Sequence, residues 1–317
     1  MILSCQNIEK AFLEKQVLKN CSFHIEDYEK AAIVGLNGAG KTTLLRIIVG
    51  QLEPDGGVVA FAKDKTFGYL AQDSAVNSDN TIYEELLSVK QHLLDLENQI
   101  RQAELSMKQL SGDALENLMQ KYADLTHRFE MENGYAYKSE LTGVLKGLGF
   151  TEDEFQKPVS TLSGGQKTRV ALGKLLLQKP DLIILDEPTN HLDMSSISWL
   201  ETYLLNYKGS VLIVSHDRYF LDRTVSRIFA FEEGGHLQQY EGNYSDYALR
   251  KSMETQEFDS ITEAGNGGRK ETSGERGESA RATWKKPARK LKFTYQEQKD
   301  YDTVSYTHLT LPTNSLV

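Results

Sequence analysis

The sequence predicts an α/β fold with a mainly parallel core sheet, an antiparallel β subdomain, a helical subdomain and an inserted antiparallel helical hairpin. First, apolar runs of strand length, at 182–185 and 211–214, alternate with helical segments. Second, a glycine-rich turn follows the apolar run 30–34 and opens an apolar helix. Third, apolar residues recur with heptad spacing inside 82–132.

The remaining elements are predicted in order along the chain. Residues 2–62 alternate strand-like runs with turns, and an apolar helix over 42–49 follows the glycine-rich turn. Two further helices are expected at 166–177 and 195–205, before and after the strand at 182–185. This alternation indicates neighbouring parallel strands joined by helical crossovers.

Residues 82–132 predict an inserted arm. Leu86, Leu93, Ile100 and Met107 repeat every seven residues, and a second row is offset by three. The turn at 111–113 ends this pattern, and a second apolar stripe follows between 115 and 129. We expect an antiparallel hairpin that protrudes from the core, and an ordinary amphipathic helix pair lying on the core is the alternative.

Composition excludes several classes of protein. The chain has 317 residues, a net charge of −9 and 39% hydrophobic residues, so it can bury a sizeable core. No apolar run approaches the ~20 residues of a membrane span, and the first residues lack the pattern of a signal peptide. We therefore expect a cytoplasmic protein without direct membrane insertion, in which Cys5 and Cys21 are buried, reduced thiols.

The C-terminal part differs in character. Residues 251–303 are predicted to form a charged and largely disordered linker or tail. Within it, 281–292 holds six basic residues and no acidic one, which fits either a solvated tether or a contact with RNA phosphates. Residues 304–317 carry no Asp, Glu, Lys or Arg and are interpreted as a non-native artefact of cloning or sequence assembly.

Residues 35–42 match the phosphate-binding pattern Gly-x4-Gly-Lys-[Ser/Thr]. Glycines allow backbone N–H groups to surround phosphates, and the N-terminus of the following helix adds a favourable dipole. Lys41 is expected to reach the β- and γ-phosphates, and the Thr42 hydroxyl to bind Mg²⁺. The candidate ATP-binding residues here are Gly35, Asn37, Gly38, Ala39, Gly40, Lys41, Thr42 and Thr43.

A pair of acidic residues follows the apolar run 182–185. A strand buried on both faces would present Asp186 at its carboxyl end, beside the phosphate-binding loop. Asp186 is then a candidate Mg²⁺ ligand, and Glu187 a candidate base for the attacking water.

With residues 162–166, Leu-Ser-Gly-Gly-Gln, the chain resembles the ATP-binding cassette ATPases. The resemblance covers residues 1–250 and implies one cassette, with 82–132 as an inserted arm. It implies that the aromatic Phe12 stacks on adenine and that Gln72 lies near the metal and the water. It also implies that His216 is the switch histidine at the γ-phosphate and that Asp193 crosses a dimer interface.

The same resemblance implies that the signature acts in trans. In this family, signature residues contact the γ-phosphate that a different cassette holds; here they are Ser163, Gly164, Gly165 and Gln166. Two cassettes must then enclose two ATP molecules. The partner is either a second copy of this chain or a second cassette outside this sequence.

Residues 186–193, Asp-Glu-Pro-Thr-Asn-His-Leu-Asp, resemble the F subfamily, the twin-cassette translation factors. The arm between Gln72 and Ser163 resembles that of an F-subfamily first cassette. The resemblance implies a ribosome-associated ATPase, in a translation factor or a ribosome-protection protein, with ribosomal RNA as a partner. The alternatives are the ATP-binding subunit of a membrane transporter and a fragment that binds ATP without turnover.

The chain also departs from the F-subfamily pattern. Residues 251–300 do not have the composition of the long charged helical linker that succeeds a first cassette. Residues 231–247 and 290–302 are more similar to the end of a second cassette and the segment after it. One interpretation is that the sequence joins the front of a first cassette to the back of a second one near 215–218.

Overall fold

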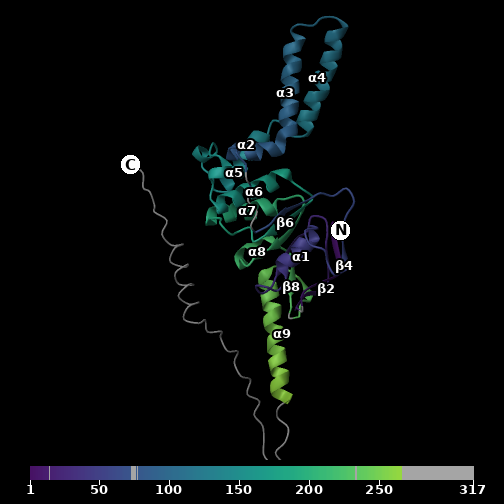
Figure 1. Ribbon diagram of the computed structural model, residues 1–317, viewed down its shortest axis with the longest axis vertical. Coiled ribbons are helices and arrows are strands. Elements are labelled where there is room, and N and C mark those ends of the chain that lie inside the picture. The colour runs from purple at the N-terminus through teal and green to yellow at the C-terminus, as the bar shows by residue number, and fades with distance from the viewer. Residues whose placement is uncertain (14, 73–75, 77, 233, 266–317) are drawn as a thin grey trace, which may run out of the picture. The chain divides into compact units, whose positions relative to one another are not determined.

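The computed structural model describes residues 1–13, 15–72, 76, 78–232 and 234–265 (Figure 1). The chain divides into two compact units, Met1–Ala264 and Gly265–Val317. Apart from Gly265, the second unit lies outside the described residues, as do most of the predicted linker and the predicted non-native tail. All elements of the functional site belong to the first unit.

A six-stranded sheet forms the centre of the first unit. Its strand order is β5-β6-β7-β3-β8-β9, and every neighbouring pair is parallel except β8 with β9. The three central strands are almost wholly buried, which explains their continuous apolar runs. The strands are β3 (Lys30–Val34), β5 (Phe67–Leu70), β6 (Leu182–Asp186), β7 (Ser210–Val214), β8 (Arg227–Phe231) and β9 (Leu237–Glu241).

A separate antiparallel sheet has the order β2-β1-β4, with β1 (Leu3–Phe12), β2 (Lys15–Ile25) and β4 (Gly56–Phe61). Helix α1 (Lys41–Ile48) shares one hydrophobic core with this sheet and with strands of the parallel sheet. Cys5 and Cys21 lie in that core as free, fully buried thiols, as the sequence predicts.

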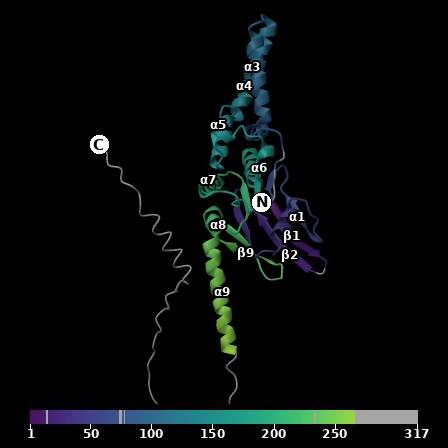
Figure 2. The ribbon, with the colours of Figure 1, turned by 60° about the vertical axis from the view of Figure 1, so that its left-hand side comes forward.

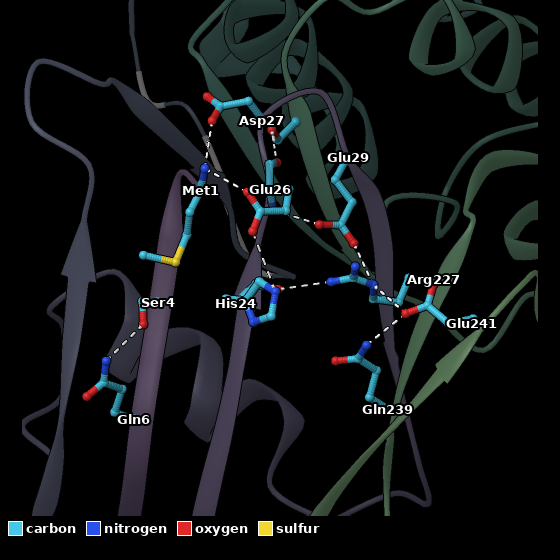
Figure 3. A network of polar contacts seen from close by, with 11 residues as sticks. Met1, Ser4, Gln6, His24, Glu26, Asp27, Glu29, Arg227, Gln239 and Glu241 are labelled. Atoms are coloured by element: carbon cyan, nitrogen blue, oxygen red, sulfur yellow. Dashed lines mark hydrogen bonds and ion pairs between the residues drawn. The ribbon is translucent and has the colours of Figure 1, made fainter.

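A polar network joins the two sheets at one edge (Figure 3). Arg227 of β8 forms an ion pair with Glu29 at 2.9 Å, and its guanidinium donates a hydrogen bond to the His24 carbonyl of β2 at 3.4 Å. A second ion pair joins Arg227 to Glu241 of β9 at 3.2 Å. These contacts join the end of β2 to the start of β8 and so hold the antiparallel sheet beside the parallel sheet.

Helices cover the other face of the parallel sheet. They are α5 (Tyr137–Gly147), α6 (Gly164–Gln178), α7 (Met194–Leu205) and α8 (Arg218–Thr224), with 3-10 turns η2 (Glu152–Glu154) and η3 (Val159–Thr161). Their apolar residues form a second core with one face of the strands. The α/β fold class predicted from the sequence is confirmed.

The segment 82–132 contains a short helix and a helical hairpin. Helix α2 (Ile82–Leu87) and the 3-10 turn η1 (Ser88–Lys90) precede α3 (Gln91–Met107) and α4 (Asp113–Met131). Helices α3 and α4 run side by side, away from the parallel sheet (Figures 1 and 2). Leu93, Leu96 and Phe129 form a small core there, with Tyr137 of α5 at its base.

The heptad pattern does not form one helix. Leu86 packs in the core under α5 and α6, and η1 interrupts the helix before Leu93 continues the seam. Leu110, at the far end of the pattern, is 41% exposed. Sequence periodicity cannot show this division, because Leu86 and Leu93 are both apolar but pack in different cores.

Helix α9 (Tyr244–Gly265) continues beyond residue 250, where the predicted cassette ends. Residues 251–264 contain no glycine or proline, so nothing in their sequence interrupts a helix before Gly265. Within the part of the chain that the structure describes, no helix is long and apolar enough to cross a membrane.

Candidate functional site

Several of the predicted site residues lie at, or just after, the carboxyl ends of four neighbouring strands. In the order β5-β6-β7-β3, these ends lead to Gln72, Asp186, His216 and the loop 35–40. Val214 of β7 is paired with Asp186 of β6 on one side and with Ile33 of β3 on the other. The carboxyl ends of these three strands are therefore level. Functional groups of open α/β sheets gather at such an edge.

A cleft of about 590 Å³ opens at this edge. It brings together residues from both sheets and from the four strand ends. Its lining consists of Phe12, Val17, Asn37, Gly38, Gly40, Lys41, Thr42, Thr43, Gln72, Asp186, Glu187, Asn190, Val214 and His216.

The loop before α1 has a backbone shape that depends on Gly40. This residue has φ of 108° and caps α1, and a Cβ placed on it would lie 2.8 Å from Val17 Cγ1 and 2.9 Å from Leu18 Cδ2. A side chain would therefore push β2 away from the loop. The absence of one leaves the N-terminal amides of α1 directed at the cleft, which suits an anion.

Lys41 is held inside the loop. It is 7% exposed, and its Nζ donates hydrogen bonds to the Gly35 carbonyl at 2.8 Å and to the Leu36 carbonyl at 3.0 Å. Burial lowers the pKa of Lys41, and the carboxylates of Glu187 and Asp186 oppose that shift. The buried cation faces an acidic strand end across the cleft, and the arrangement leaves room for polyphosphate.

Asp186 and Thr42 meet across the cleft floor. Asp186 is 2% exposed, and its Oδ2 accepts a hydrogen bond of 3.2 Å from the Thr42 hydroxyl. Burial raises the pKa of Asp186, although the Thr42 hydrogen bond opposes this effect. A buried carboxylate beside a hydroxyl is a donor set that fits Mg²⁺, because this ion prefers hard oxygen ligands and its charge would compensate the buried carboxylate.

Glu187 lies beside His216. Its backbone N–H donates to the Val214 carbonyl at 2.8 Å, and its φ of 51° is left-handed, which turns the side chain out of the strand direction. The His216 amide donates to Glu187 Oε2 at 3.3 Å, and His216 Nε2 lies 3.6 Å from Oε1. Among the described residues, Oε1 is buried and has no hydrogen-bond partner, which leaves an unsatisfied polar atom at this point of the site.

Phe12 of β1 lines the cleft. The residue is 46% exposed, and Lys10 Nζ lies 5.9 Å from the centre of its ring. Val17, which is not among the predicted site residues, lines the cleft beside it; pairing of Phe12 with Lys15 across the β1–β2 turn brings the two together. That hairpin pairing is the signal that could have identified Val17.

Asn190 also lines the cleft and is not among the predicted site residues. In the sequence it serves only to mark the resemblance to a subfamily. Its backbone N–H bonds to the Glu187 carbonyl at 3.2 Å, so a tight turn returns it to the site. A turn-forming Pro-Thr-Asn sequence directly after the acidic pair could have suggested this position.

The predicted signature residues are not brought to this cleft. Ser163 caps α6, where its hydroxyl accepts from the Gln166 amide at 3.3 Å and the Gln166 side chain accepts from the Ser163 amide at 3.1 Å. Gly164 and Gly165 form the first turn of α6, and a Cβ on Gly165 would touch His191 at 3.0 Å. The cleft and the signature are therefore separate surfaces of one chain.

Asp193 also lies outside the cleft lining. It caps α7, accepting a hydrogen bond of 2.7 Å from the Ser196 amide and one of 2.9 Å from the Ser195 hydroxyl. The Ser196 amide is the main reason that the pKa of Asp193 is below its usual value. Gly35 and Ala39 belong to the loop before α1 and do not line the cleft.

The family model described as ABC transporter matches residues 18–190. The chain is 46% identical over 254 residues to the putative ATP-binding protein YdiF of Bacillus subtilis, covering 80% of this chain and 39% of that protein. It is 37% identical to ABC transporter F family member 5 of Arabidopsis thaliana, over 79% of this chain and 37% of the relative. Its identity to the energy-dependent translational throttle protein EttA of Mycobacterium tuberculosis is 37%, with coverages of 79% and 44%.

A solved structure, the ATP-binding subunit of an ABC transporter, matches with a TM-score of 0.55 at 20% identity, over 76% of this chain and 90% of that one. At this identity the likeness supports the cassette fold alone. The chain spans less than half the length of the three curated relatives above.

The fold and the cleft define an ATP-binding cassette protein. The chain belongs to the F subfamily of this family.

Proposed function

We propose that this chain binds Mg-ATP in the cleft, hydrolyses it together with a second cassette, and works on the ribosome. The observation that carries the proposal is the meeting of the Lys41 loop, the Asp186–Glu187 pair and His216 in one cleft. These groups come from separate segments of the chain, and together they match the requirements of phosphoryl transfer to water.

ATP binding is assigned to the loop 35–43 and Phe12. The amides at the start of α1 and the Lys41 ammonium would hold the phosphates, replacing the carbonyl contacts that Lys41 makes in this structure. Phe12, which lines the cleft and is partly exposed, offers a flat apolar surface for adenine. Thr43, Asn37 and Gly38 also line the cleft.

Hydrolysis is assigned to Glu187, His216 and Gln72. The Glu187 carboxylate accepts a proton from the attacking water as the water oxygen bonds to the γ-phosphorus and the bond between that phosphorus and ADP breaks. His216, next to Glu187, stabilises charge on the transferred phosphoryl group, and Gln72 orients the water and the metal site. Thr42 and Asp186 would hold Mg²⁺, which neutralises phosphate charge when bound.

A second cassette would complete the site. Ser163, Gly164, Gly165 and Gln166 begin a helix on a surface that does not line the cleft of their own chain. Their helix N-terminus suits a γ-phosphate presented by a partner, and Asp193 would lie near the same contact. The partner is a second copy of this chain or a second cassette.

The ribosomal role rests on the relatives. One of them is named an energy-dependent translational throttle protein, and residues 186–193 of this chain resemble the F-subfamily pattern. A translation factor or a ribosome-protection protein in the cytoplasm agrees with that name.

Ribosome sedimentation tests this proposal. Glu187→Gln, which should bind ATP and hold it, is centrifuged through sucrose with ribosomes, with ATP or ADP present. We expect the variant to sediment with ribosomes in ATP and to remain behind in ADP. Lys41→Ala is the matched control and should not sediment in either nucleotide. Equal sedimentation of both variants would show nonspecific binding by charge and would contradict an ATP-dependent ribosomal role. Absence of sedimentation of Glu187→Gln in ATP would contradict that role as well.

A further inference from the structure

The start of α2 is bonded to the segment just before the signature. Residues 80–83 and 155–159 lie in an antiparallel arrangement, outside either sheet. The backbone hydrogen bonds run from the Ile82 amide to the Lys157 carbonyl at 3.0 Å, from Tyr83 to Phe155 at 3.0 Å, and from Val159 to Asn80 at 2.9 Å. The root of the helical hairpin and the approach to Ser163 are thus one backbone unit.

A buried ion pair adds a second connection. Glu85 of α2 is 5% exposed, and its Oε1 forms a short contact with Lys174 Nζ on α6. Its Oε2 accepts a hydrogen bond of 3.1 Å from Asn80 Nδ2. Most ion pairs of the described residues are more exposed; the pair of Lys146 with Glu152, for example, has side chains that are 54% and 69% exposed. Because Glu85 is almost fully buried, its carboxylate would be unfavourable there without the ammonium of Lys174, whose side chain is 28% exposed.

Close apolar packing accompanies the pair. A Cβ placed on Gly173 of α6 would lie 3.1 Å from Leu86 Cδ2 and 3.5 Å from Val144 Cγ1. The missing side chain at Gly173 lets α2 and α6 approach closely. Lys174 is eleven residues after Ser163, so one continuous helix of about 16 Å joins the ion pair to the signature.

We propose that Glu85 and Lys174 are positioning residues for ATP hydrolysis, which hold the signature helix α6 to the root of the α3–α4 hairpin. A partner that displaces the hairpin would then displace residues 163–166 relative to the ATP of the second cassette. The inference rests on the proposed action of the signature in trans. It adds that movement of the arm would affect ATP hydrolysis through the position of α6, and not through the cleft of the same chain.

The first test separates turnover from ATP affinity. In the full chain, Glu85→Gln and Lys174→Met should lower kcat by about tenfold or more, with the Kd for a fluorescent ATP analogue within about twofold. The double exchange of Glu85→Lys with Lys174→Glu restores the opposite charges and should recover part of kcat. Lys146→Met removes an exposed ion pair of α5 and is the matched control, with kcat unchanged. A merely structural role would instead lower thermal stability and ATP affinity together.

Ser163→Ala, measured in parallel, distinguishes the two proposals. A loss of kcat in Ser163→Ala with wild-type kcat in Glu85→Gln would overturn the positioning role and leave the signature role intact. Wild-type kcat in Ser163→Ala would overturn the proposed signature function.

A distance measurement between spin labels tests the connection between the arm and α6 independently of the ATPase activity. Spin labels at Met119→Cys on α4 and Gln178→Cys at the end of α6 report the distance between arm and signature helix; the native cysteines are buried. The distance distribution should broaden in the Glu85→Gln background and not in the Lys146→Met background. An unchanged distribution in Glu85→Gln would overturn the proposal whatever the activity of Ser163→Ala.

Discussion

The Thr42 hydroxyl donates a hydrogen bond of 3.2 Å to Asp186 Oδ2, although the two residues are 144 positions apart. This contact joins the start of α1 to the carboxyl end of β6; in the sheet, one strand, β7, separates β6 from β3, which precedes α1. Because one residue supplies a hydroxyl and the other a buried carboxylate, their contact is where we assign Mg²⁺.

Asp186→Asn should raise the Mg²⁺ concentration for half-maximal ATPase activity by at least about tenfold, because a neutral amide is a poorer ligand for a hard cation. Magnesium titration of the steady-state ATPase measures this change. Asp181→Asn is the matched control, since Asp181 precedes β6, pairs with Lys65 and does not line the cleft. A magnesium requirement equal to that of the wild type would contradict the assignment of Asp186.

Lys41→Ala should abolish nucleotide binding, because the buried ammonium supplies the charge that faces the phosphates. Fluorescence titration with an ATP analogue tests this. Lys63→Ala, at an exposed position outside the cleft, should bind like the wild type. Unchanged affinity in Lys41→Ala would mean that the loop is not a phosphate-binding loop.

Gly40→Ala should destabilise the protein by about 1–3 kcal/mol, because its φ of 108° is unfavourable for alanine and the new methyl group would contact Val17. Urea unfolding measures the free energy, and the ATP affinity should fall with it. The control is Gly143→Ala: its Cβ meets nothing within 4 Å and it lies inside helix α5, so we expect a gain of up to about 1 kcal/mol. Equal stability of the two variants would contradict the packing argument.

Cys5 and Cys21 should resist a thiol reagent at about pH 8 in the native protein and react at once in denaturant. Burial raises the pKa of Cys5 to about 12, with a smaller contribution from Cys21, and burial also raises the pKa of the Cys21 thiol. The reactive thiolate is therefore scarce, and both sulfurs are inaccessible. Absorbance of the released chromophore follows the reaction; rapid modification of native protein would show that the core between the two sheets opens readily.

The contribution of Glu85 to stability should depend on pH. Burial alone would raise its pKa, but hydrogen bonds from Lys174, Asn80 and Ser78 outweigh it, so the pKa in the folded protein is below the ordinary 4.5. A lowered folded pKa means that the stabilisation is complete above about pH 4.5 and is lost as the pH falls through the folded value. The difference in unfolding free energy between wild type and Glu85→Gln should therefore shrink in acid.

Urea unfolding at a series of pH values checks the Glu85 prediction. Glu130→Gln, at an exposed position on α4, is the control and should change stability by less than about 0.5 kcal/mol at any pH. A difference for Glu85→Gln that stays constant down to low pH would show that the lost interaction is not that of the ionised carboxylate.

The strand ends were predictable from the sequence because each apolar run stops directly at a polar residue or a glycine. The runs before Asp186 and His216 and before the Lys41 loop each show this transition, and parallel strands then align these ends. Val17 was not predictable in this way, because it belongs to the other sheet. The β1–β2 pairing brings it beside Phe12, and the missing side chain at Gly40 lets β2 approach the loop before α1. The division at η1 was hidden because the heptad pattern contains one leucine, Leu86, that packs in the main core.

Catalysis by Glu187 is best tested by the steady-state ATPase of Glu187→Gln, measured beside the wild type at several protein concentrations. We predict unchanged ATP binding and a turnover lower by about 10²–10⁴-fold, because the amide cannot accept the proton of water. If each signature serves a second copy of this chain, as proposed, the wild-type activity per molecule should rise with protein concentration. Turnover of Glu187→Gln within about tenfold of the wild type would contradict the proposed mechanism, because the carboxylate would then not be the base.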